Sequence, residues 1–305
     1  MRRLFNAAMF ALALAAETSA AGGVVVVHPA VRGAYLDAFE QILEGIDGAL
    51  PEPALRLVQG SDEAGDLREA LRRALPKVVV ALGGDGGLCG TAPGVHFIVG
   101  AVLSPEGLEC RVFGGVALAP DPDRLFALLR ELAPGVKRVW VLHRPAVSGW
   151  LMPFARRAAA AHGLALHVEA AEDLYRAAER YREWLDRPLG PEDAVWVPQD
   201  PVAAESTLLA ELLKAAWRQN FVLFSSVPSH VQRGALFALY PDYRAMGRRL
   251  GRLAREALEA QGGVKPVGVQ PLSDVLVAVN LRSADHLGLD LARRRESFDL
   301  VFPQR

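Results

Sequence analysis

Cysteine is scarce in this chain of 305 residues, with only Cys89 and Cys110. This scarcity excludes the disulfide-dense scaffold of a small secreted domain. It also gives no support to a thiolate zinc site, and we expect neither a bound metal nor a cofactor. The two cysteines permit one disulfide in an oxidising compartment. The sequence leaves that bond open, because it does not give the distance between the two Cα atoms.

The chain also lacks an excess of charge of either sign and a membrane-length apolar run. Its 34 Lys and Arg residues nearly balance 35 Asp and Glu residues, for a net charge of −1. This balance gives no reason to expect nucleic acid or an anionic membrane surface as a partner. The apolar segment 4–16, interrupted by Asn6, is shorter than the roughly 20 residues of a spanning helix.

The first residues are instead typical of a secretory signal peptide over residues 1–21. Arg2 and Arg3 precede the apolar segment, and the small residues 18–21 follow it, so we expect cleavage near Ala20 or Ala21. No cysteine comes directly after the small residues, which argues against a lipid anchor. The alternative is a buried N-terminal helix. The pattern predicts export to the periplasm and a mature chain that begins near Gly22.

Apolar strands alternate with helical patterns along the remaining chain. A β-branched run at 24–27 and apolar segments at 55–58, 77–82 and 95–102 are separated by helical spacing at 35–46 and 66–75. This order predicts a parallel sheet with right-handed crossovers. A second series of the same kind runs from Asp121 to Phe224. The fold class we predict is α/β, with two Rossmann-like lobes built on parallel central sheets.

The C-terminal third predicts a hinge of several strands. A strand at 236–239, an Arg-rich helix at 243–260 and a strand at 276–280 follow the second lobe. We therefore assign residues 22–116 plus 236–270 to lobe 1, and residues 117–235 plus 271–305 to lobe 2. One continuous sheet is the alternative.

Ligands of open parallel sheets bind beyond the carboxyl ends of the strands. An Arg there can pair with a carboxylate, a Trp can stack on a flat ligand, and an Asp can accept from an ammonium group. Each residue also has a plainer use: a structural histidine, a tight turn, an N-cap or a turn-closing serine. The candidate ligand-binding residues are His28, Pro29, Gly84, Asp85, Ser104, Arg144, Ser148, Trp150, Asp200, Ser225 and Ser226.

The segment Gly83-Gly84-Asp85-Gly86 requires comparison with an enzyme loop. It resembles the nucleotide loop of NAD kinases and diacylglycerol kinases, where glycines admit phosphates and the Asp acts in catalysis. An exported protein has no ATP supply, and Leu88-Cys89-Gly90 lacks the Thr that follows in those kinases. The GxSxG and HExxH patterns are absent as well. We therefore predict a protein that is not an enzyme, with a GGDG-type kinase as an alternative.

Four ordered stretches resemble a known family. They read GGVALAPDPDRLFALLRELAPGVKRVWVLHRP, AVWVPQDP, VLFSSVPSHVQRGALFALYPDYRAMGRRLGRLAREALEAQ and DVLVAVNLRSADHLGLDL. With the HPA near the start, the set is similar to ABC-transporter substrate-binding proteins of the tryptophan/tyrosine type. The resemblance covers nearly all of the mature chain. It implies the type I periplasmic-binding-protein fold, three strand crossovers at the hinge, and no catalysis.

The resemblance also assigns site positions. By position, the family's site residues correspond to His28 and Pro29, Asp200, Ser225 and Ser226, and Asp242 and Tyr243. The chain departs from the family where it has Gly83-Gly84 after the third strand, Leu103-Ser104-Pro105 after the fourth, and Arg144-Pro145 after the first strand of lobe 2. These departures remove polar ligand contacts.

The function we expect is therefore periplasmic capture of a small amino-acid-like or carboxylate-bearing molecule between two lobes. The expected partners are this ligand and an ABC-transporter permease, with no nucleic acid, and we expect a monomer. An exported sensory or partner-binding module without a permease is the alternative.

Overall fold

The structure is a computed structural model that describes residues 23–59, 67–84, 87–88, 94–108, 112–187, 189–202, 205–260 and 266–304. The predicted signal peptide lies outside these residues, as do Asp85, Cys89 and Cys110. In the described part of the chain, no helix is both long and apolar enough to cross a membrane.

The first sheet is wholly parallel. Its strand order is β11-β5-β4-β3-β1-β2. The strands are β1 (Val24–Pro29), β2 (Leu55–Gln59), β3 (Val78–Leu82), β4 (His96–Val102), β5 (Gly114–Pro120) and β11 (Gly268–Leu272). β3, in the middle of the sheet, is buried along its whole length, as expected of a strand covered on both faces.

The second sheet is parallel except for one pairing. Its order is β13-β12-β10-β9-β8-β6-β7, and only β10 and β12 run antiparallel among its described pairs. The strands are β6 (Arg138–His143), β7 (Ala165–Ala170), β8 (Asp193–Val197), β9 (Val222–Ser225), β10 (Phe237–Pro241), β12 (Val275–Asn280) and β13 (Leu300–Phe302).

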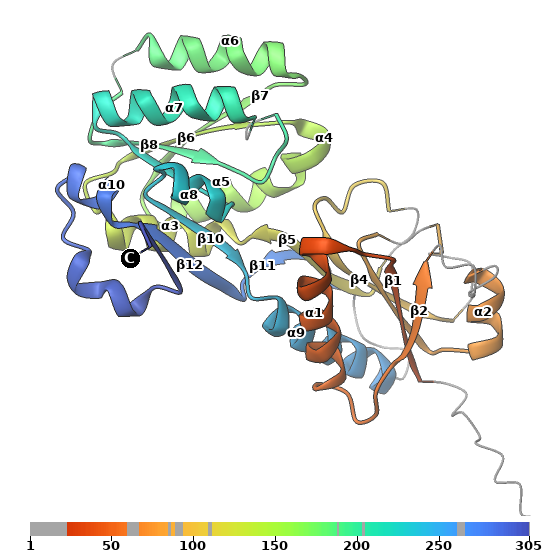
Figure 1. Ribbon diagram of the computed structural model, residues 1–305. Helices are drawn as coiled ribbons and strands as arrows, with labels where there is room; N and C mark the ends of the chain where they lie inside the picture. The colour runs from red at the N-terminus through yellow and green to blue at the C-terminus, as the bar shows by residue number, and fades with distance from the viewer. Residues whose placement is uncertain are drawn as a thin grey trace, which may run out of the picture.

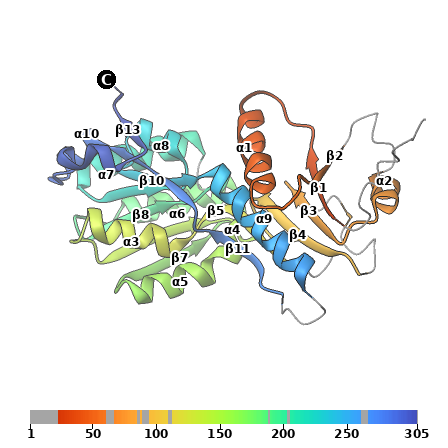
Figure 2. The ribbon, with the colours of Figure 1, turned by 90° about the horizontal axis from the view of Figure 1, so that it is seen from below.

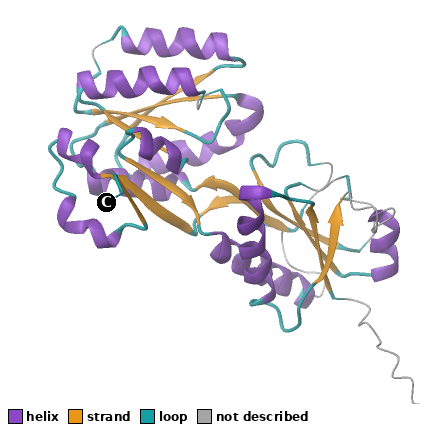
Figure 3. Ribbon diagram, viewed as in Figure 1, coloured by secondary structure: helices purple, strands orange, loops and turns teal. Residues whose placement is uncertain are grey.

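Helices cover both faces of each sheet (Figures 1 and 3). On the first sheet, one core cluster includes α1 and α9, and a second on the other face includes α2. On the second sheet, one cluster includes α3, α5 and α10, and the other includes α6, α7 and α8. The helices are α1 (Leu36–Asp47), α2 (Leu67–Ala74), α3 (Pro122–Leu132), α4 (Pro145–Ser148), α5 (Met152–Ala161), α6 (Leu174–Leu185), α7 (Ser206–Gln219), α8 (Pro228–Arg233), α9 (Tyr243–Glu259) and α10 (Leu281–His286), with 3₁₀ turns η1 (Gly33–Tyr35), η2 (Gly149–Leu151) and η3 (Ala292–Ser297).

Helices α1 and α9 lie against each other through glycines. A Cβ built on Gly45 would lie 2.3 Å from the carbonyl oxygen of Arg244, and one on Gly247 would lie 2.1 Å from that of Ile42. Both distances are shorter than any real Cβ contact. The backbones of the two helices therefore approach more closely than any other residue type would allow.

The chain passes between the two sheets three times, which confirms the predicted multi-strand hinge (Figure 2). The crossings run from β5 to α3, from β10 to α9, and from β11 to β12. Asp121 and Asp242 begin the helices after the first two crossings, and the side chain of each accepts from a backbone N–H of its helix. We call the first sheet with α1, α2 and α9 lobe 1, and the second sheet with the remaining elements lobe 2.

The crossings lie a few residues from the predicted boundaries. β10 pairs with β9 and β12 in lobe 2, whereas the sequence pattern assigns the whole segment 236–270 to lobe 1. β5 stays in lobe 1 through Pro120, which pairs with Leu272 of β11. The hydrophobic pattern marks a strand but does not identify its partner, so the sheet that takes up a hinge strand is decided by tertiary pairing.

Candidate functional site

The loops that carry the predicted site residues face each other across the hinge. In lobe 1, β5 ends at a crossing, so the parallel strands β1, β3 and β4 also end on the side of lobe 2. In lobe 2, β10 ends at a crossing, so β6, β8 and β9 end on the side of lobe 1. The carboxyl ends of both sheets are therefore directed toward one interlobe region.

Trp150 joins the two lobes beside this region. Its indole Nε1 donates to the carbonyl oxygen of Leu103, at 3.2 Å, in the loop after β4. The Trp150 ring packs against core clusters of both lobes. Figure 1 shows α4, which immediately precedes Trp150, on the side of lobe 2 that faces lobe 1. A predicted site residue thus lies at an interlobe contact.

Asp200 is buried, with 1% of its surface exposed, and its carboxylate is used within lobe 2. One oxygen accepts from the backbone N–H of Arg144 at 2.8 Å and from the Ser148 hydroxyl at 2.5 Å. The other accepts from the backbone N–H of Val202 at 3.0 Å. Asp200 and Ser148, both predicted ligand contacts, therefore fix the loop after β8 to α4 after β6.

Ser225 and Ser226 also make internal bonds. The Ser225 hydroxyl donates to the carbonyl oxygen of Val197 at 3.0 Å and lies 2.8 Å from Nδ1 of His230. Because the hydroxyl has a single proton, Nδ1 of His230 is the donor in the second bond. The indole of Trp196 donates to the Ser226 hydroxyl at 3.2 Å. Ser225 closes the turn after β9, because its hydroxyl also accepts from the backbone N–H of Val227 at 3.1 Å. The Ser226 hydroxyl instead binds the indole of β8.

Two buried histidines border these networks. Burial, together with the nearby charge of Arg233, lowers the pKa of His230 to about 4. Burial also lowers the pKa of His143, against the opposing influence of the Asp200 carboxylate. Nδ1 of His143 has no hydrogen-bond partner among the described residues. His143 lies at the end of β6, one residue before the predicted Arg144, and its position there was the only signal for it in the sequence.

On the lobe 1 side, the predicted residues lie at strand ends. Nδ1 of His28 lies 3.0 Å from the carbonyl oxygen of Pro29, and its ring packs at a tilt against Phe39. Gly84 has φ +137°, a conformation that favours glycine. The Ser104 hydroxyl accepts from the backbone N–H of Glu106 at 3.1 Å.

The candidate site lies around Gly149, where side chains of both lobes approach each other. Arg144 is exposed, and its guanidinium takes part in no ion pair with the described residues. A Cβ on Gly149 would lie 3.9 Å both from Oε1 of Glu106 in lobe 1 and from Cε1 of His143 in lobe 2. Glu106 of lobe 1 and His143 of lobe 2 thus lie close together beside Gly149, and Arg144 and Trp150 are the chain neighbours of His143 and Gly149. The described residues hold no group of three His, Cys, Asp or Glu side chains that suits a metal ion.

No protein-family model and no curated protein matches this chain. Solved structures do match. A conserved domain protein from Vibrio cholerae shares 20% identity, covers 92% of this chain and 99% of its own, and has a TM-score of 0.54. An ABC domain from Streptococcus pneumonia, in complex with L-Trp, shares 18% identity over 92% of this chain and 100% of its own, with a TM-score of 0.55.

A third match is the ligand-free, open structure of CD0873, a substrate-binding protein with adhesive properties from Clostridium difficile. It shares 16% identity over 88% of this chain and 95% of its own, with a TM-score of 0.61. At such identities the similarity concerns the fold. The chain has the type I periplasmic-binding-protein fold, which confirms the predicted fold class.

Proposed function

We propose that this protein is an exported solute-binding protein that holds a small carboxylate-bearing or amino-acid-like molecule between its lobes and delivers it to an ABC transporter. The observation that carries the proposal is the direction of the strands. The parallel strands of both lobes end on the side of the three crossings, so the loops of the two sheets face each other.

The mechanism is closure of two lobes on a shared ligand. A ligand that contacts loops of both lobes makes all its contacts only when the lobes meet, and it therefore shifts the population toward the closed form. Three chain crossings let the lobes rotate about a common region while each sheet stays intact. Trp150, which already contacts lobe 1 through Leu103, lies where closure would bring further side chains together.

The Arg144 side chain supports a carboxylate-bearing ligand. Its guanidinium is exposed and unpaired within the described chain, while its backbone N–H is fixed by the buried Asp200. A guanidinium binds a carboxylate through two parallel hydrogen bonds, and Trp150 offers an apolar face nearby. Asp200, in contrast, uses its carboxylate inside lobe 2, so its part in the site is to position Arg144.

The binding test uses the mature chain, from Gly22 onward, in a thermal-shift screen against L-tryptophan, L-tyrosine and small mono- and dicarboxylates. We expect at least one of these ligands to raise the melting temperature. Calorimetry should then show that Arg144→Gln weakens the bound ligand by at least tenfold. Arg182→Gln, an exposed change on α6 of the same lobe, is the matched control. A ligand that binds both variants equally would remove Arg144 from the site.

Delivery to a transporter requires a separate test in cells. Uptake of the radiolabelled ligand should fall when the gene is deleted and return when it is supplied again. Unchanged uptake, with ligand binding intact, would identify an exported sensory module instead of a transport component.

A further inference from the structure

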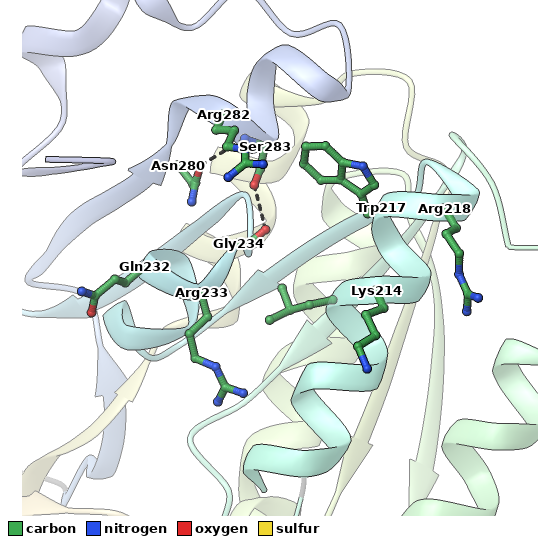
Figure 4. Close-up of a pocket in the computed structure, with 10 residues that line it drawn as sticks. Lys214, Trp217, Arg218, Gln232, Arg233, Gly234, Asn280, Arg282 and Ser283 are labelled. Carbon is green, nitrogen blue, oxygen red and sulfur yellow. Dashed lines mark hydrogen bonds between the residues drawn. The ribbon is translucent and has the colours of Figure 1, made fainter. Parts of the chain in front are cut away.

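A cavity lies at the end of lobe 2 that is opposite the hinge. Gly234 precedes the start of β10, Asn280 ends the antiparallel β12, and Trp217 lies in the last turn of α7. Because β10 runs toward the hinge, these three positions are at the distal end of the lobe. The cavity has a volume of about 510 Å³, within the usual range for small-molecule pockets (Figure 4).

The lining of this distal pocket is positively charged. Four cationic side chains line it, namely Lys214, Arg218, Arg233 and Arg282, and its described lining contains no Asp or Glu. Lys214 pairs with Glu211 at 2.9 Å on the exposed surface, which neutralises it only in part. Arg218 and Arg282 form no ion pair with the residues that the structure describes. The pocket therefore retains a positive charge that its own side chains do not balance.

Helix stabilisation does not account for all of this charge. Arg218 lies in the last turn of α7 and Arg233 in the last turn of α8, where a cation interacts favourably with the helix dipole. Arg282 lies in the first turn of α10, where a cation gains nothing from the dipole. Its side chain instead lies over the ring of Trp217, with Cζ 5.6 Å from the ring centroid.

Trp217 is exposed but firmly held. It keeps 43% of its surface exposed, and the ring of His286 stacks on it with centroids 3.6 Å apart. Nε2 of His286 donates to the backbone carbonyl of Trp217 at 2.8 Å, which satisfies a carbonyl at the end of α7. The aromatic wall of the pocket is thus fixed before any ligand arrives, which reduces the entropy lost on binding.

Two neutral polar side chains of the pocket, Asn280 and Ser283, are already paired. Asn280 donates to the carbonyl oxygen of Val231 at 2.8 Å and accepts from the backbone N–H of Ser283 at 3.1 Å. The Ser283 hydroxyl donates to the carbonyl oxygen of Gly234 at 2.8 Å, as drawn in Figure 4. What the pocket offers a ligand is therefore positive charge beside a fixed aromatic ring.

We infer that the distal pocket binds a small anion with at least two negative charges, carried by carboxylate or phosphate groups. Cations from α7, α8 and α10 surround the cavity, so an anion with several charged groups contacts more of them than a monovalent ion does. The site lies on lobe 2 alone and does not require closure of the lobes.

Calorimetric titration with citrate and with inorganic pyrophosphate, at low and at physiological salt, tests this inference. We expect binding of at least one probe that weakens as salt rises. The double variant Arg218→Gln/Arg282→Gln should reduce its affinity at least tenfold. Arg124→Gln, an exposed change on α3 of the same lobe, should leave the affinity unchanged.

A variant in the interlobe site distinguishes binding there from binding in the distal pocket. Arg144→Gln, which is designed to weaken the interlobe ligand, should not alter binding of the anion probe. Equal affinity in the double variant and the Arg124 control would overturn the inference, as would the absence of binding by both probes. Binding of an acidic peptide such as oligoglutamate without binding of either small anion would also overturn it, in favour of a protein-docking surface.

Discussion

Asp121 and Asp242 hold equivalent positions in two of the three hinge crossings. Each follows a proline that ends a strand, and each side chain caps the helix that starts in the next lobe. The backbone N–H of each donates to the third crossing, from Asp121 to Leu272 at 2.8 Å and from Asp242 to Asp274 at 3.1 Å. The three crossing segments are thus held together by a repeated Pro-Asp arrangement.

Replacing Asp242 by Ala should destabilise the protein through this hinge. The change removes the acceptor for the backbone N–H of Ala245 at the start of α9. Loss of an N-cap costs about 1 kcal/mol, with a range of about 0.5–2 kcal/mol. Chemical denaturation measures the free energy of unfolding. Asp186→Ala, at an exposed Asp beyond the end of α6, is the control and should show no such loss. Equal stability of Asp242→Ala and the wild type would show that the cap is dispensable.

Many strand and helix positions could be predicted because local patterns determine them, but the short elements β11, β13, α8 and α10 could not. The β-branched run at 24–27 and the Asp–Pro start of α3 each encode one element, and the structure has both. The same holds for the direction of the site loops, since parallel strands that alternate with helices end on one side. The local hydrophobic pattern was therefore sufficient to predict the fold class and the general location of the candidate site.

The contacts of individual side chains depended on residues far apart in the sequence. Asp200 contacts Ser148 and the backbone of Arg144, more than 50 positions away, so no local pattern distinguishes its internal use from a ligand contact. The antiparallel pairing of β10 with β12 could not be predicted from local sequence for the same reason. The distal pocket, formed by three separate helices, gave no sequence signal.

Trp150 should hold the two lobes near one another even without ligand. Trp150→Ala removes both the hydrogen bond to Leu103 and the packing against the two core clusters. Trp150→Phe removes only the hydrogen bond and keeps an aromatic ring. We expect the radius of gyration from solution scattering to rise in the Ala variant and to rise less in the Phe variant. Trp217→Phe, at the distal pocket, should leave it unchanged. No increase in either Trp150 variant would contradict a tethering role.

Asp200 should matter for folding more than for ligand affinity. Asp200→Ala leaves the backbone N–H groups of Arg144 and Val202 and the Ser148 hydroxyl without their acceptor. An unsatisfied buried group costs about 1–3 kcal/mol, so the free energy of unfolding should fall by at least that much. Asp200→Asn retains an acceptor and should lose less. A large loss of ligand affinity in Asp200→Asn, with stability unchanged, would return Asp200 to the list of ligand contacts.

The stability of the protein should fall as the pH drops from about 6.5 to about 4. Burial lowers the folded-state pKa of His230 to about 4, whereas an unfolded histidine titrates near 6.5. Between these values the unfolded state binds more protons, so acid favours unfolding, and the loss from this group between pH 7 and pH 5 is about 1–2 kcal/mol. His230→Asn keeps a donor for Ser225 but does not titrate. Denaturation at both pH values should show a smaller loss in this variant. The same loss in both proteins would assign the pH dependence to other groups.

The close contact between α1 and α9 predicts a strong effect of a single methyl group. Gly247→Ala would place a Cβ 2.1 Å from the carbonyl oxygen of Ile42, and that backbone cannot move without moving α1. Overpacking of a well-packed core costs about 1–3 kcal/mol, and we expect the upper end because the obstacle is backbone. Gly135→Ala, where a Cβ would have no atom within 4 Å, is the control and should be nearly neutral. Thermal denaturation of both variants measures the difference. Similar melting temperatures would mean that α9 can shift away from α1, and the lobe 1 core would then be looser than this packing indicates.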